Sequence, residues 1–92
     1  MFLLLYYLKL YNANKKGNVC IMKLNKIIAK NLKDLRKQFD LTQNEVAEKL
    51  DVVYQTYQAY EIGTNIPPVK NLIMLADLYE VSLDYLVGRK EY

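Results

Sequence analysis

The side chains on which catalysis most often depends are scarce in this chain of 92 residues. It contains no histidine and no tryptophan, and its single cysteine is Cys20. This composition excludes histidine acid–base catalysis, Ser-His and Cys-His nucleophiles, and zinc sites built from Cys and His. We therefore expect a protein that is not an enzyme and that needs no metal or other cofactor. A lone cysteine cannot form an internal disulfide, which favours a reducing, cytoplasmic setting.

Charge is the second chemical feature, and it is polarised along the chain. Residues 23–37 contain six basic side chains and one acidic side chain, whereas residues 38–92 contain four basic and nine acidic ones. The lysines of the first segment recur at steps of three or four residues, at Lys23, Lys26, Lys30, Lys33 and Lys37. A basic stripe of this kind suits a polyanion such as nucleic acid, although a merely solvated helix face would have the same pattern.

The apolar residues and the turn signals indicate which elements carry these side chains. One apolar stripe recurs at helical spacing, at Leu24, Ile27, Ile28, Leu32, Leu35 and Phe39. Thr42 and Glu45 have the spacing of a capping box, which predicts the start of a second helix with Val46, Ala47 and Leu50 facing inward. Asp51 and Val52 predict a tight turn, in which Asp51 would adopt a positive φ.

Three further helices complete the prediction. The first runs from about Val53 to Glu61 and is capped by Gly63. The next begins near Pro68 and has a predicted inner face of Val69, Leu72, Ile73, Leu75, Ala76 and Tyr79. Ser82 caps the last, Leu83–Val87, which Gly88 ends. Because no part of the domain shows sustained strand alternation, we expect an all-α fold of five helices.

Several short motifs follow one another in a fixed order along this segment. They are Leu41-Thr42-Gln43, Val46-Ala47-Glu48-Lys49-Leu50, Tyr60-Glu61 with Gly63, Pro68, Leu75-Ala76-Asp77, and Val81-Ser82-Leu83-Asp84-Tyr85-Leu86-Val87-Gly88. Together they resemble the helix-turn-helix domain of the Cro/lambda-repressor-like, or Xre, family over residues 24–88. The resemblance implies a compact five-helix DNA-binding domain over residues 23–88, followed by a C-terminal tail over residues 89–92.

The resemblance also implies which residues contact DNA. The family's base-reading positions fall on Val53, Tyr54, Gln55, Gln58 and Ala59. Gln55 is the strongest candidate, because a glutamine amide can donate to adenine and accept from it at once. Gln43 matches a phosphate-contacting glutamine at a helix N-terminus, and Asn65 and Lys70 are further candidate backbone contacts. A solvated helix face is the alternative for both Gln55 and Gln58, and Tyr57 and Tyr60 are interpreted mainly as core residues.

By resemblance, then, the chain is a sequence-specific DNA-binding transcriptional regulator, a repressor of phage or mobile-element type. It would bind a pseudo-palindromic operator in double-stranded DNA as a homodimer. A candidate dimer patch is Leu83, Tyr85, Leu86 and Val87, which could equally close the core. The alternative is an antitoxin or other protein-interaction module whose partner is a toxin or an anti-repressor. The absence of any basic residue between Lys49 and Lys70 keeps that alternative open.

Residues 1–22 differ from the rest of the chain and form an N-terminal extension of uncertain structure. The apolar run Phe2–Leu8 is far shorter than the roughly 20 residues of a membrane helix, so no membrane contact is expected. Residues 12–18 read as a turn or linker. Three interpretations remain: an element that pairs with a second copy, a loosely attached arm, or a non-native extension before a true start at Met22.

Overall fold

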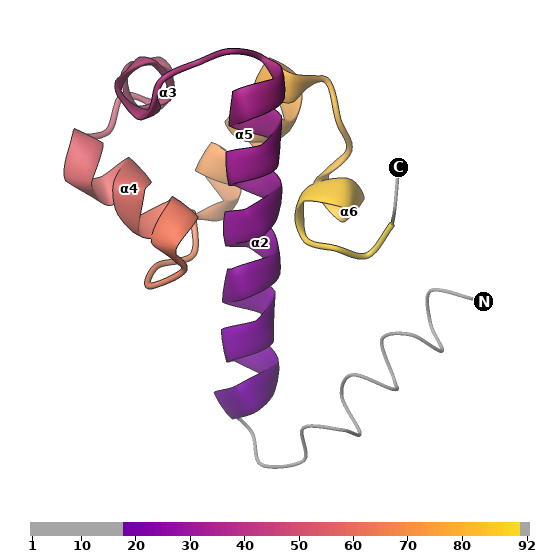
Figure 1. Ribbon diagram of the computed structural model, residues 1–92. Helices are drawn as coiled ribbons and strands as arrows, with labels where there is room; N and C mark the ends of the chain where they lie inside the picture. Colours follow the sequence, from indigo (N-terminus) through magenta and orange to yellow (C-terminus); the bar gives the residue numbers. More distant parts are fainter. Residues whose placement is uncertain (1–17, 91–92) are drawn as a thin grey trace.

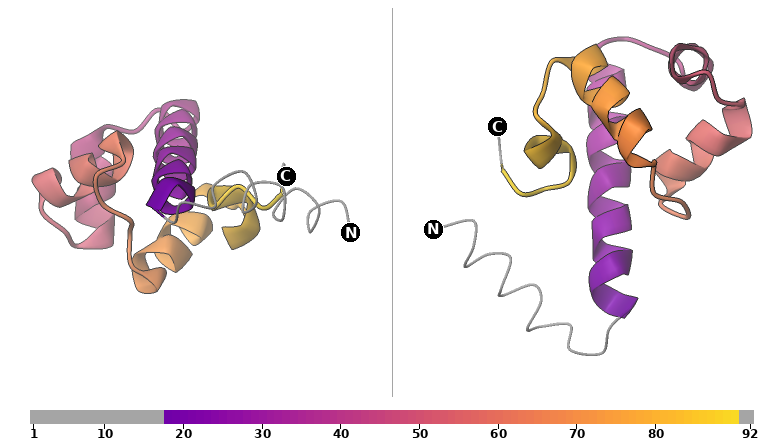
Figure 2. Two further views of the ribbon diagram at one scale, coloured as in Figure 1. Left: turned by 90° about the horizontal axis from the view of Figure 1, so that it is seen from below. Right: turned by 180° about the vertical axis from the view of Figure 1, so that it is seen from behind.

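The computed structural model describes residues 18–90, with side chains from residue 23 onward. Within these residues it contains five helices and no strand, which confirms the all-α prediction. The helices are α2 (Asn18–Gln38), α3 (Gln43–Leu50), α4 (Tyr54–Ile62), α5 (Val69–Tyr79) and α6 (Leu83–Leu86). The long helix α2 stands in the middle, with α3 and α4 on one side of it and α6 on the other (Figures 1 and 2).

The predicted helix boundaries around α3 are confirmed. The Glu45 amide donates to Thr42 Oγ1 at 3.1 Å, and the Thr42 amide donates to Glu45 Oε1 at 2.9 Å. The backbone and hydroxyl of Thr42 lower the pKa of the Glu45 carboxyl. Asp51 ends the helix in the left-handed region at φ 57°, as expected for a residue that tolerates a positive φ. This turn redirects the chain from α3 into α4.

The core forms where the inner faces of the helices meet. Leu32, Val46, Tyr57, Leu75 and Leu86 are all fully buried. Each comes from a different helix, so one continuous core holds all five helices together. Tyr57 packs edge-on against Tyr60, with ring centroids 6.1 Å apart, which confirms both as core residues.

Several helix boundaries differ from the prediction, among them the end of α6, which is Leu86 rather than Val87. Helix α2 begins at Asn18, so Asn18 lies in a helix rather than in the predicted linker, and Met22 lies inside that helix. The sequence from Asn18 to Met22 contains no glycine or proline that would interrupt a helix. Helix α4 begins at Tyr54, and Val53 is the extended residue that precedes it.

The predicted inner faces of the helices were partly wrong. Val69 and Ile73 are 67% and 45% exposed, whereas Leu72, Ala76 and Tyr79 are buried. Val69 and Ile73 are one turn apart on α5 and lie beside the buried stripe of Leu72, Ala76 and Tyr79, on a side that no other described helix covers fully. Phe39 is 41% exposed because it lies past the end of α2, although its ring still packs edge-on against Tyr79 at 5.2 Å.

Two glycines at helix ends permit a prediction about stability. Gly88 has φ +83°, and a Cβ added there would lie 2.6 Å from Ile27 Cγ2, while one added at Gly63, at φ +96°, would meet only ordinary contacts of 3.7 Å. Both alanine variants incur left-handed backbone strain of about 1–2 kcal/mol. Because Gly88→Ala adds a clash with a branched side chain, we expect it to lower the free energy of unfolding more than Gly63→Ala does. Urea denaturation checks the order, and equal losses would contradict it.

Candidate nucleic-acid interface

The start of α4 presents several of the predicted base-reading residues to solvent. Val53, Tyr54 and Gln55 are exposed, and Gln58 and Ala59, one turn later, are half-buried. The Gln55 side chain makes no hydrogen bond to any of residues 23–90, so within this part of the chain its amide is free for an external partner. The structure therefore places the five positions at one end and along one side of α4.

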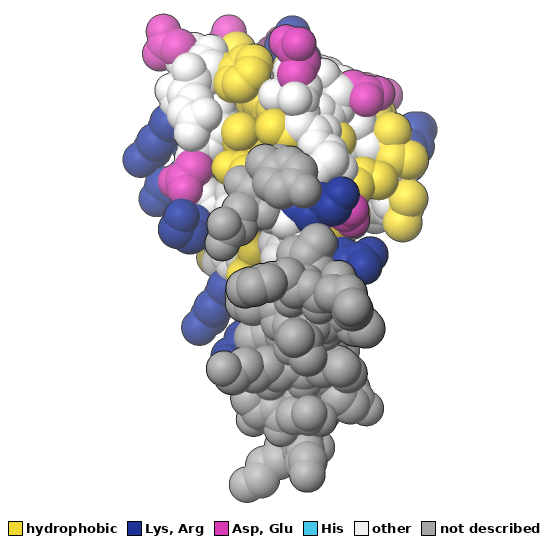
Figure 3. Space-filling model, turned by 90° about the vertical axis from the view of Figure 1, so that its right-hand side faces the viewer, with side chains coloured by type: hydrophobic (Ala, Val, Ile, Leu, Met, Phe, Trp, Pro, Cys, Tyr) yellow, Lys and Arg dark blue, Asp and Glu magenta, His cyan; other side chains and the backbone are white. Residues whose placement is uncertain are grey.

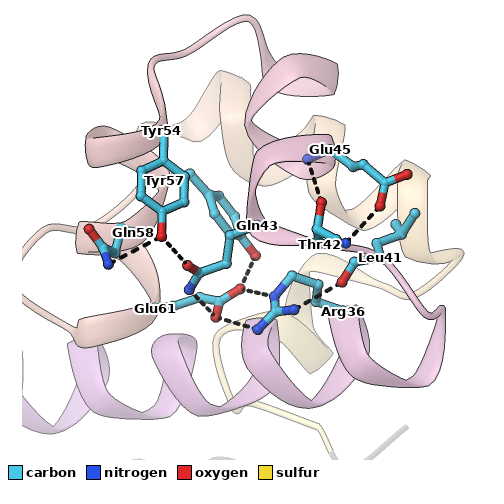
Figure 4. Close-up of polar contacts among 9 residues, drawn as sticks. All are labelled: Arg36, Leu41, Thr42, Gln43, Glu45, Tyr54, Tyr57, Gln58 and Glu61. Atoms are coloured by element: carbon cyan, nitrogen blue, oxygen red, sulfur yellow. Dashed lines mark hydrogen bonds and ion pairs between the residues drawn. The ribbon is translucent and has the colours of Figure 1, made fainter.

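Three of the predicted site residues are joined by hydrogen bonds, as Figure 4 shows. Gln58 Nε2 donates to the Tyr54 hydroxyl at 3.4 Å. That hydroxyl donates to Gln43 Oε1 at 3.0 Å, and Gln43 Nε2 donates to Glu61 Oε1 at 3.0 Å. Gln43 at the start of α3 is thus fixed by two residues of α4. A primary amide carries two N–H donors, so one Gln43 N–H remains for a phosphate.

Glu61 is the last acceptor in this chain of hydrogen bonds. Its side chain is 3% exposed and accepts from Arg36 Nε at 2.7 Å and Nη2 at 3.1 Å, and also from the Tyr57 hydroxyl. Arg36, 14% exposed, also donates through Nη1 to the Leu41 carbonyl at 2.9 Å. The Arg36–Glu61 ion pair therefore fixes α2, the start of α3 and α4 relative to one another (Figure 4).

The ion pair was not anticipated from the sequence. In the sequence, Glu61 is noticeable only as part of the Tyr60-Glu61 motif, and Arg36 only as one of the six basic residues in the segment 23–37. One signal was available, because Glu61 is the only charged residue between Asp51 and Lys70 and follows Tyr57 by one turn. A single carboxylate on a helix that otherwise lacks charge points to a specific partner.

The electrostatics of Glu61 follow from its partners. Burial alone would raise the pKa of the Glu61 carboxyl, but hydrogen bonds from Arg36, Tyr57 and Gln43 outweigh burial and hold that pKa below 4.5. Burial raises the pKa of the Tyr57 hydroxyl, and its hydrogen bond to Glu61 raises it further. At neutral pH the carboxylate is ionised and the phenol is protonated, which is the pairing that the geometry requires.

The depressed pKa predicts how stability depends on pH. A group whose folded pKa lies below its unfolded value stabilises the fold fully above the unfolded pKa, here 4.5, and loses that contribution as the pH falls through the folded pKa. We expect the free energy of unfolding to decline below about pH 4.5, and to decline less in Glu61→Gln. Urea titrations at several acidic pH values measure this slope. An identical decline in both proteins would contradict the assignment.

The other two predicted contacts lie apart from this cluster. Asn65 is in the loop after α4 and Lys70 is in the first turn of α5, and both are exposed. No hydrogen bond within residues 18–90 connects either side chain to Gln43, Tyr54 or Gln58. Among residues 23–90, whose side chains the structure describes, no group of three or more Asp or Glu side chains is suited to a metal ion. None of the described helices combines the length and hydropathy that crossing a membrane requires.

Comparison with known proteins decides the family. The helix-turn-helix family model matches residues 32–86, which include α3, α4, the turn between them and most of the core. The chain belongs to the helix-turn-helix family. This membership confirms the resemblance to the Xre and Cro-like regulators, and the matched residues include both α3 and α4.

Three proteins similar to this helix-turn-helix chain are named as transcriptional regulators or as a transcriptional repressor. The HTH-type transcriptional regulator YqaE of Bacillus subtilis is 44% identical, over 66% of this chain and 53% of the relative. ImmR of the same organism, also an HTH-type transcriptional regulator, is 39% identical over 70% of this chain and 50% of its own length. The cryptic phage CTXphi transcriptional repressor RstR of Vibrio cholerae is 36% identical over 67% and 55%.

The chain thus spans about half the length of the curated relatives that it matches. The three alignments cover 61 to 64 residues each. No solved structure matches the chain.

Proposed function

We propose that this protein is a sequence-specific DNA-binding regulator of transcription that acts in the cytoplasm as a repressor of phage or mobile-element type. The observation that carries the proposal is the free amide of Gln55 at the exposed start of α4, beside the fixed Gln43–Tyr54–Gln58 cluster. A helix that enters the major groove by its N-terminal end brings such an amide to the base edges. Relatives named as regulators and as a phage repressor support the same class.

Gln43 has the second role in this proposal, as a phosphate contact. It is the first residue of α3, where backbone N–H groups lack intrahelical partners and carry a partial positive charge. Its side chain retains one N–H after donating to Glu61. A phosphate at this helix end would fix the register of α4 in the groove. Asn65 in the loop after α4 and Lys70 at the start of α5 would contact further phosphates of the DNA backbone.

We further propose that two copies bind a pseudo-palindromic operator. Half-sites about 34 Å apart are the usual solution for a small domain that reads few bases. Of the predicted dimer patch, Leu86 is fully buried in the core, while Leu83 is 39% exposed and Tyr85 and Val87 are half-buried. Leu83 is therefore the residue of this patch best placed to contact a second copy.

Footprinting tests this proposal on the DNA that flanks the protein's own gene. Two protected segments one helical turn apart are expected, and both should weaken in Leu83→Lys if α6 forms the dimer contact. Uniform partial protection along the fragment would contradict sequence-specific binding.

A second candidate function, binding to a toxin or an anti-repressor, is favoured by one observation. Four exposed apolar side chains occupy the end of α4, the following loop and the start of α5, namely Ile62, Ile66, Val69 and Ile73. Exposed apolar side chains that form a contiguous patch are typical of protein contacts. Recovery of a single stoichiometric protein from the host by the wild type, and its loss with Val69→Lys, would favour this function over DNA binding alone.

A further inference from the structure

The lysines of α2 differ in where they lie relative to the proposed DNA surface. Positions 25, 29 and 36 share one side of the helix, because an α-helix turns 100° per residue. This side faces α4: Asn25 Nδ2 donates to the Gly63 carbonyl at 3.2 Å, Ala29 lies against Gly63, and Arg36 binds Glu61. The opposite flank contacts α6, where Asn31 donates to the carbonyls of Tyr85 and Leu86 at 3.0 and 3.1 Å.

Lys26 and Lys33 lie immediately beside the α4-facing side, on the flank turned away from the core. Both side chains are exposed, and neither has an ion-pair partner among residues 18–90. Lys30 differs, because its ammonium is 2.9 Å from Asp34 Oδ2 and its charge is already matched. Lys23 and Lys37 likewise have no ion-pair partner among the described residues, but at 100° per residue they lie further round the helix, so Lys26 and Lys33 are the unmatched lysines nearest α4.

Helix α2, which carries this pair, is linked to the proposed recognition residues through the buried Arg36–Glu61 ion pair. Lys33 lies three residues before Arg36, whose partner Glu61 also holds Gln43 and thereby Tyr54 and Gln58. On α4, Gln58 lies one turn before Glu61, on the flank that carries the exposed Ile62. The buried ion pair thus joins the side of α4 that presents the glutamines to the side of α2 that presents Lys26 and Lys33.

The distribution of cations along the chain indicates that DNA binding needs a second contact surface besides α4. The stretch from Leu50 to Val69, which contains all of α4 and the following loop, has no cation. On the face drawn in Figure 3, Lys and Arg side chains form a column down the left edge, while most acidic ones gather toward the top. DNA binding by a small domain depends on cations that displace condensed counterions from the phosphates.

We propose that Lys26 and Lys33 bind backbone phosphates of the same duplex that α4 reads, as a second contact strip that supplies the cations missing from α4. This inference rests on the proposed function. The strip would contact the DNA backbone beside the groove that holds α4, and its contribution would be independent of base sequence. Lys30, held by Asp34, would contribute less.

The test is the salt dependence of binding by the full chain. Fluorescence anisotropy would follow a labelled duplex from the DNA flanking the protein's own gene, and a scrambled duplex of equal composition, between about 50 and 200 mM salt. The double variant Lys26→Gln/Lys33→Gln should lower the slope of log K against log salt by about 0.9 per lost contact. The change in affinity across that range should therefore shrink by about tenfold, equally for both duplexes.

Lys49→Gln is the matched control. Lys49 is also an exposed lysine, but it lies on α3 beside the carboxylates of Glu45 and Glu48, so its removal should leave the slope unchanged. A slope that stays the same in the double variant, while the wild type binds the native duplex, overturns this inference and leaves the proposed function standing. Failure of the wild type to bind either duplex overturns both. Equal far-ultraviolet circular dichroism of all three proteins verifies the fold.

Discussion

Replacement of Glu61 by glutamine should lower the free energy of unfolding by about 3 kcal/mol, because it leaves the Arg36 guanidinium in a buried site without a counter-charge. The site is dry: the Glu61 and Arg36 side chains are 3% and 14% exposed. Glu61 also accepts from Tyr57 and Gln43, so the substitution replaces a carboxylate that satisfies several donors on three helices. A loss of this size corresponds to a fall in Tm of at least about 12 °C in a domain of this length.

Two controls separate the buried charge from a general effect of mutation. Asp34→Asn removes the partner of Lys30 in a pair whose side chains are 48% and 75% exposed, and it should leave stability almost unchanged. The double variant Arg36→Met/Glu61→Leu removes both charges at once and should be far more stable than Glu61→Gln, because no unpaired charge remains. If Glu61→Gln unfolds at the same urea concentration as the wild type, the ion pair does not hold the helices together.

Replacement of Gln55 by alanine should weaken binding to the native DNA by about 5- to 150-fold, the equivalent of the 1–3 kcal/mol that a bidentate base contact provides. The Gln55 side chain is exposed and makes no hydrogen bond to residues 23–90, so Tm should be unaffected. The variant should bind scrambled DNA as the wild type does, because its loss concerns base readout alone. Anisotropy titrations on both duplexes measure the difference.

Gln38→Ala is the matched control for this loss. Gln38 is an exposed glutamine at the last position of α2, outside the start of α4, and its removal should change neither affinity nor stability. If Gln55→Ala keeps wild-type affinity for the native DNA, or fails to fold, the recognition surface lies elsewhere on the molecule.

The fold was predictable because its boundaries are encoded locally. Thr42 with Glu45, the turn at Asp51, Gly63, and Ser82 each act within a few residues, and the structure contains all four signals where they were expected. The exposure of Val69 and Ile73 was not predictable in this way, since it depends on how closely neighbouring helices approach α5. Periodicity identifies an apolar side of a helix but not how much of that side is covered.

The candidate site, like the fold, was predictable where it depends on local motifs and not where it depends on contacts between distant residues. Gln55 and Gln58 could be named from their place in the motif, and the structure puts both on the outward side of α4. The hydrogen bonds that fix Gln43 depend on Arg36 and Glu61, which are separated by 25 residues in the sequence. Contacts over such a distance arise only once α2, α3 and α4 have packed together, so the sequence pattern alone does not reveal them.

The most direct test of sequence-specific DNA binding is one anisotropy comparison. The full chain would be titrated onto the duplex that flanks its own gene and onto a scrambled duplex, each at about 50 and 200 mM salt. We predict tighter binding to the native duplex, with a preference that survives at the higher salt because base contacts are less sensitive to salt than phosphate contacts. Equal and weak binding to both duplexes would contradict sequence-specific DNA binding and would favour a protein partner.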